Sequence, residues 1–109
     1  MEARLVNQHA AVAALCRQFG VSRLEVFGSA STGEFDPASS DYDLIARFST
    51  QPGVSMARRF LGFSDALEAL LESRVDLMID HAIANPYLRA AVDASRTTVY
   101  AEPLAETLV

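Results

Sequence analysis

The stretch that decides the fold runs from residue 21 to residue 48 and reads VSRLEVFGSASTGEFDPASSDYDLIARF. Apolar and charged side chains alternate towards the end of residues 21–27, which predicts a strand that runs into the small-residue turn Gly28-Ser29. Residues 30–40 are rich in Ser, Gly, Asp and Pro and predict a loop. Alternation resumes over 41–48, which predicts a second strand with Asp41 and Asp43 on one face and apolar side chains on the other.

The sequence on either side of this stretch predicts helices and further strands. Apolar residues recur at spacings near three and four over 2–19 and over 56–71, which predicts two amphipathic helices, the second interrupted near 62–64. Residues 74–80 predict a third strand that carries Asp76 on its polar face. Asn85-Pro86 predicts the start of a third helix, and residues 97–100 are suited to a last edge strand. This order predicts one small α/β domain over residues 1–109.

Composition narrows the class of protein. The 109 residues carry 9 Lys+Arg against 14 Asp+Glu, a formal charge of −5. A nucleic-acid binder gains affinity by neutralising phosphates with Lys and Arg, so this balance argues against direct nucleic-acid binding. Cys16 has no second cysteine to pair with, and we find neither a basic-then-apolar leader nor a spanning apolar run. We therefore expect a cytoplasmic protein with no membrane segment.

Three acidic residues and one glycine turn carry the chemistry. On a strand, Asp41 and Asp43 have roots roughly 6.5–7 Å apart on one face, and Asp76 would join them from the neighbouring strand. Three close carboxylates repel one another, whereas Mg²⁺ neutralises them and keeps open positions for phosphate oxygens. Gly28 lets a phosphate approach the backbone closely, and the Ser29 hydroxyl adds a donor. The pattern predicts a metal site beside a triphosphate site.

These motifs together resemble the minimal nucleotidyltransferase family, whose catalytic fold is related to that of DNA polymerase beta. The resemblance rests on Phe27-Gly28-Ser29, eleven intervening residues, the stretch 41–44 (DYDL) and then Val75-Asp76-Leu77, and it covers nearly the whole chain. It implies an α/β (α+β) fold with a mixed β-sheet flanked by helices. One departure is the loop at 30–34 (ASTGE), where the family often has an arginine.

The resemblance implies transfer of a nucleoside monophosphate, AMP from ATP, to a hydroxyl. Two Mg²⁺ ions, bound in part by Asp41, Asp43 and Asp76, would align the reactants, and Asp76 would accept the proton. Some family members are antitoxins that modify HEPN toxins, which implies a HEPN-type toxin as the protein partner. The alternative is a non-catalytic module that neutralises a toxin by binding it, with a vestigial active site. Transfer to a small molecule such as an antibiotic ranks third.

Each of these residues also has a structural interpretation. Asp41, Asp43 and Asp76 could lie on a solvent-facing strand face, and Gly28-Ser29 could be an ordinary turn. Other polar or aromatic residues are predicted to have structural roles only: Asp80 at the surface, His9 and His81 without metal, Cys16 in the core, Tyr87 and Tyr100 in packing, and Arg58 and Arg59 on a solvated helix face with phosphate binding as the alternative.

Overall fold

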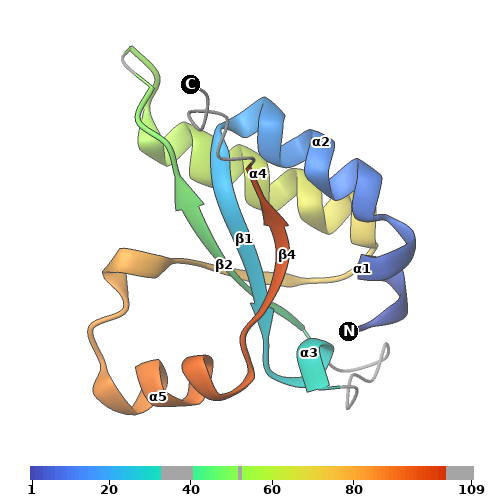
Figure 1. The fold of residues 1–109 in the computed structure, drawn as a ribbon. Helices are drawn as coiled ribbons and strands as arrows, with labels where there is room; N and C mark the ends of the chain where they lie inside the picture. Colours follow the sequence, from blue (N-terminus) through green and yellow to red (C-terminus); the bar gives the residue numbers. More distant parts are fainter. Residues whose placement is uncertain (33–40, 52, 103–109) are drawn as a thin grey trace, which may run out of the picture.

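The computed structural model describes residues 1–32, 41–51 and 53–102, and within them four strands form one sheet (Figure 1). The strands are β1 (Val21–Phe27), β2 (Tyr42–Phe48), β3 (Val75–Ile79) and β4 (Thr97–Ala101), in the spatial order β3-β2-β1-β4. β1 is antiparallel to both β2 and β4, whereas β3 is parallel to β2. The sheet is therefore mixed, as expected, and β4 confirms the predicted edge strand.

Helices connect and cover these strands: α1 (Ala3–Asn7), α2 (His9–Phe19), α3 (Ser29–Thr32), α4 (Met56–Leu71), the 3-10 turn η1 (Asp80–Ala82) and α5 (Pro86–Ser95). The α4 helix crosses from β2 to β3, because two parallel strands need such a crossover. The predicted ends are confirmed at Gly20, which stops α2 at φ +72°, and at Asn85, whose side chain accepts from the amides of Tyr87 and Leu88.

The structure corrects several predicted boundaries. The helix expected over 2–19 is two helices that meet at Gln8, so that Leu5 and Val12 both reach the core. The α4 helix is not interrupted at 62–64. A Cβ on Gly62 would lie 2.8 Å from the Phe19 ring, so this glycine permits close packing of α4 on α2. The strand predicted over 74–80 ends before Asp80, which belongs to η1. The loop predicted over 30–40 begins with the end of α3, up to Thr32, and residues 33–40 lie outside the described residues.

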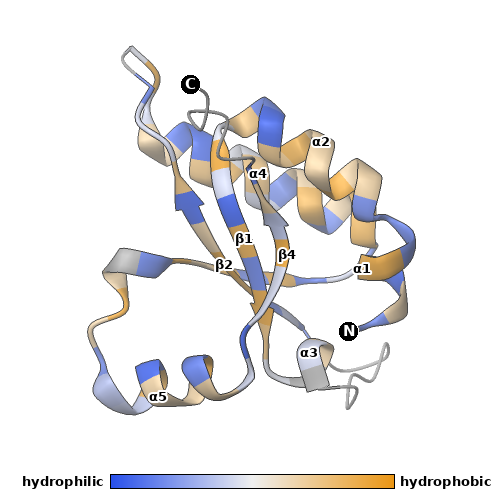
Figure 2. Cartoon of the chain, viewed as in Figure 1, coloured by the Kyte–Doolittle hydropathy of each residue, from blue (hydrophilic) through white to orange (hydrophobic). Residues whose placement is uncertain are grey.

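The core has two parts, one on each face of the sheet. On one face α1, α2 and α4 bury the larger cluster, which includes Leu24, Leu44, Phe63 and Leu67. On the other face α5 contributes Val92, which packs with Phe27 and Ile45. Figure 2 shows apolar and polar positions interleaved along the strands, as expected when each face of a strand has a different environment. Cys16 is fully buried and Tyr100 packs against the larger cluster, as predicted.

The edge strand β4 contains an irregularity. The pairing of β1 with β4 shifts between Leu24 and Glu25, so Val99 has no partner on β1. The His9 ring donates from Nε2 to the Val99 carbonyl oxygen at 2.9 Å. This histidine thus has a structural partner in the strand.

None of the helices in the described part of the chain is both long and apolar enough to cross a bilayer.

Candidate active site

Two of the predicted carboxylates lie side by side on the sheet. Asp43 in β2 is the register partner of Asp76 in β3, and neighbouring strands are about 4.8 Å apart. Asp43 alternates with Ile45, so its side chain is on the face that α5 covers. Asp76 is exposed and Asp43 is half-buried. The parallel pairing of β2 with β3 therefore brings together two acids that are far apart in the sequence.

The glycine turn lies directly against one of these acids. Phe27, the last residue of β1, pairs with Asp43, and Gly28 follows it with φ +69°. A Cβ at Gly28 would lie 2.8 Å from Asp43 Oδ2, so only glycine fits here without displacing the carboxylate. Ser29 begins α3, but its side chain lies outside the described part of the structure. The predicted phosphate turn and the predicted acid are thus adjacent.

The electrostatics of Asp43 show that the three acids interact. Burial raises the pKa of Asp43, and the negative charges of Asp76 and then Asp41 raise that pKa further. The charged form of Asp43 is therefore disfavoured in the folded protein. A cation bound beside it would relieve this repulsion.

Asp41 occupies a different position from the other two acids. It lies one residue before β2, and its Oδ1 pairs with Arg74 Nε at 3.1 Å. Within residues 1–32, 41–51 and 53–102, no three His, Cys, Asp or Glu side chains converge closely enough to hold a metal ion. The type of ligand fits Mg²⁺, and Asp43 and Asp76 are adjacent, but Asp41 would have to leave Arg74 to complete the set.

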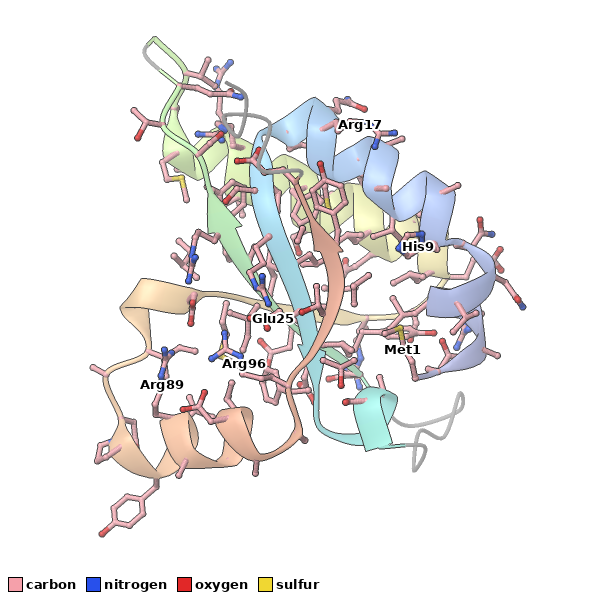
Figure 3. The ribbon with its side chains drawn as sticks, in the orientation of Figure 1. Met1, His9, Arg17, Glu25, Arg89 and Arg96 are labelled. Carbon is pink, nitrogen blue, oxygen red and sulfur yellow. The ribbon has the colours of Figure 1, made fainter. Side chains whose placement is uncertain are left out.

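A network of charged side chains lies on the same face, towards the other end of the strands. The carboxylate of Asp80 pairs with Arg89 at 2.9 Å, Arg47 at 3.0 Å and Arg96 at 3.4 Å. Arg96 also pairs with the buried Glu25 (Figure 3). These arginines hold the pKa of Asp80 below its usual range, although burial alone would raise it. Asp80 was predicted to be a surface residue, and that was wrong, because it is only 8% exposed.

Two further predictions about single residues are also wrong. Arg59 does not lie on a solvated face: it is buried, and it donates from Nε to Phe19 O at 2.9 Å and from an η nitrogen to Gly20 O at 2.8 Å. It therefore caps the end of α2, because those carbonyls have no partner within the helix. Tyr87 does not pack, since it is 86% exposed at the start of α5.

The structure adds one residue that the sequence did not indicate. Ser95, the last residue of α5, accepts a hydrogen bond on Oγ from the amide of Gly28 at 3.0 Å. It is 67 residues from Gly28 along the chain, so no local spacing could have signalled the contact. An apolar cavity of about 320 Å³ is lined in part by Met78, Ile83 and Leu88, and neither Gly28 nor Ser95 is among its lining residues.

Most of the chain matches a known protein family. Residues 10–97 match the family model of the nucleotidyltransferase domain, a range that includes β1, β2 and β3. The chain belongs to this nucleotidyltransferase family. As a member of it, the chain is a nucleotidyltransferase, and the glycine turn and acidic strands described above are its candidate active site.

Individual relatives of this nucleotidyltransferase support the same placement. A Methanocaldococcus jannaschii protein named "Putative protein adenylyltransferase MJ0128" is 32% identical over 79 residues, covering 72% of this chain and 76% of that protein. A solved "putative minimal nucleotidyltransferase" is 34% identical, with a TM-score of 0.71 over 89% of this chain and 95% of that one.

Single chains from two toxin–antitoxin structures share the fold of this nucleotidyltransferase. A chain from a toxin–antitoxin structure with AMP-PNP superposes with a TM-score of 0.66 at 20% identity, over 92% of this chain and 78% of that one. A chain from the complex of tri-AMPylated Shewanella oneidensis HEPN toxin with MNT antitoxin gives 0.62 at 17% identity, over 95% and 78%. At these identities the likeness concerns the fold alone.

Proposed function

We propose that this nucleotidyltransferase transfers AMP from ATP to a hydroxyl of a partner protein in the cytoplasm, and that the partner is a HEPN-type toxin. The observation that carries the proposal is the contact of Gly28 with Asp43, together with the register of Asp43 and Asp76. The adenylyltransferase name of one relative and the antitoxin complexes among the structural neighbours support the choice of donor and partner. In this proposal residues 1–109 act as one catalytic domain.

Each residue has a role in the proposed transfer. Gly28 and Ser29 bind the triphosphate, because the missing side chain of Gly28 lets phosphate oxygens approach the backbone of the turn closely and the Ser29 hydroxyl adds a donor. The acceptor oxygen attacks the α-phosphorus of ATP, the bond from that phosphorus to the bridging oxygen breaks, and pyrophosphate leaves. Asp76, which is exposed and next to Asp43, accepts the proton of the acceptor hydroxyl.

Asp43, Asp76 and, once it is released from Arg74, Asp41 are the residues that would hold Mg²⁺. When bound, Mg²⁺ would neutralise phosphate charge and lower the pKa of the acceptor hydroxyl. The raised pKa of Asp43 supports a cation at this position, since burial and then the nearby charges of Asp76 and Asp41 disfavour its carboxylate without one.

Labelled nucleotide tests this proposal directly. The purified chain is incubated with ATP labelled on the α-phosphate, MgCl₂ and the candidate toxin, and label on the toxin is measured. We expect transfer by the wild type and a loss on the order of 100-fold for Asp43→Asn. Asp65→Asn is the matched control, because Asp65 is exposed on α4, on the opposite face of the sheet. Equal transfer by both variants would exclude Asp43 from catalysis.

A second candidate function is neutralisation of the toxin by binding alone. The specific observation in its favour is that Asp41 is paired with Arg74, while no three acidic, histidine or cysteine side chains in the described residues converge closely enough to hold a metal ion. A chain that carries both Asp41→Asn and Asp43→Asn separates the two functions. If that variant still protects cells from the toxin while transfer is lost, binding is the function, and if protection is lost with transfer, catalysis is.

A further inference from the structure

Polar contacts connect the end of α5 to the glycine turn, and they involve residues that belong to none of the sequence motifs. Gly28 donates its amide proton to Ser95 Oγ at 3.0 Å. Ser31, one turn further along α3, donates its hydroxyl to the Ser95 carbonyl at 2.5 Å and shares a hydrogen bond of 2.7 Å with Thr97 Oγ1. The turn is thus attached to the junction of α5 and β4 at several points.

This junction is itself held firmly against the sheet. Arg96 follows Ser95, and its guanidinium pairs with the two buried carboxylates, Glu25 in β1 and Asp80 in η1. Figure 3 shows Arg96 and Glu25 close together between the sheet and α5. Because Arg96 is bound from two elements, the position of Ser95 relative to Gly28 is defined by the core of the domain and not by a loose loop.

The Ser95 hydroxyl has a proton that no group in the described part of the chain accepts. A serine hydroxyl can accept hydrogen bonds and donate one. Here Oγ accepts from Gly28, and the other contacts of this residue involve its carbonyl oxygen, which accepts from Ser31 and Thr97. Ser95 is half-buried, and the hydrogen bond from Gly28 places its Oγ directly at the turn. One donor is therefore available beside the amide of Gly28.

From this arrangement we propose that Ser95 is a nucleotide-binding residue: its hydroxyl orients the Gly28 amide and donates its own proton to a phosphate oxygen of the bound triphosphate. The inference rests on the proposed triphosphate site at Gly28 and Ser29. It adds a donor from Ser95, the last residue of α5, which is far from the motif residues in the sequence but in contact with the turn. A hydroxyl suits this position because it can satisfy the turn amide and a phosphate oxygen at the same time.

Nucleotide affinity and kinetics of three variants test the inference. Ser95→Ala removes the hydroxyl, Ser95→Thr keeps it, and Ser31→Ala breaks the same attachment of the turn without touching the Gly28 amide. We expect Ser95→Ala to bind AMP-PNP with MgCl₂ about 10-fold more weakly, the size of one hydrogen bond to a charged group, and to raise KM for ATP more than it lowers kcat. Ser95→Thr should restore the affinity, and Ser31→Ala should lower the thermal midpoint but keep the affinity.

The outcomes separate this inference from the proposed function. If the wild type binds AMP-PNP and Ser95→Ala binds it equally well, Ser95 is excluded while the nucleotide site stands. If Ser31→Ala weakens binding as much as Ser95→Ala does, the attachment as a whole matters and the hydroxyl does not donate to phosphate. If the wild type binds no nucleotide, the proposed function fails and this inference fails with it.

Discussion

Replacement of Gly28 by alanine tests the contact on which the candidate site depends. Gly28 has φ +69°, a conformation that costs an L-residue roughly 1–2 kcal/mol. The new Cβ would lie 2.8 Å from Asp43 Oδ2, whereas ordinary contact begins at 3.4 Å, so the carboxylate must move by more than half an ångström. Displacements of about 1 Å in an active site can cost 100-fold in rate, so we expect Gly28→Ala to lose about 10-fold or more.

Gly53→Ala is the matched control for this experiment. Gly53 has φ +81°, but a Cβ there would meet no atom within 4 Å. Both variants therefore place an alanine at positive φ, and this backbone strain should lower the thermal midpoint by about 5–10 °C for a chain of this size. Only Gly28→Ala also displaces Asp43. Thermal unfolding and labelled AMP transfer are measured on both proteins.

The reasoning is refuted if the two variants lose the same activity, because the loss would then follow from stability. It is also refuted if Gly28→Ala keeps full activity at a temperature where it is folded, because the contact with Asp43 would then be irrelevant to the site.

Three other perturbations follow from the charges and caps of the structure. The pKa of Asp43 is raised in the folded state, so stability falls as pH rises above the ordinary value of 3.8. Asp43→Asn should therefore be more stable than the wild type at pH 7 but not at pH 3, and equal urea midpoints at pH 7 would contradict this. The pKa of Asp80 is lowered, so its contribution is present at neutral pH and lost as pH falls below 3.8. Asp80→Asn should lower the free energy of unfolding, measured in urea at pH 7, by about 1–2 kcal/mol. The loss is no larger because solvent screens the partly exposed arginines that pair with Asp80. An unchanged urea midpoint would show that the network does not stabilise the fold. Asn85→Ala removes the N-cap of α5 and should lower the free energy of unfolding in urea by about 1 kcal/mol. A loss of only about 0.3 kcal/mol or less would contradict a stabilising cap.

The sequence predicted those parts of the fold that depend on local pattern. Alternation located β1 and β2, and Asn85-Pro86 located the start of α5, because these signals come from a few neighbouring residues. Boundaries shifted where packing competes with pattern. The chain bends at Gln8 so that both short helices reach the core, and Gly62, which suggested an interruption, serves instead for contact with Phe19.

The candidate site was predictable only where its residues belong to a motif. Gly28, Asp43 and Asp76 were named from spacing, and the parallel register of β2 and β3 places the two acids together. Asp80 and Ser95 carry no such signal. Their partners, Arg96 and Gly28, are 16 and 67 residues away, and only the position of α5 on the sheet brings them into contact.

The irregular pairing at Val99 has a consequence for the behaviour of this protein in concentrated solution. An exposed outer strand can recruit a strand from another molecule and start aggregation. In β4 the unpaired residue interrupts the ladder, and His9 occupies its carbonyl, so the middle of the strand is a poor template for intermolecular growth. The irregular pairing at Val99 and the hydrogen bond from the His9 ring thus protect the outer strand from pairing with another molecule.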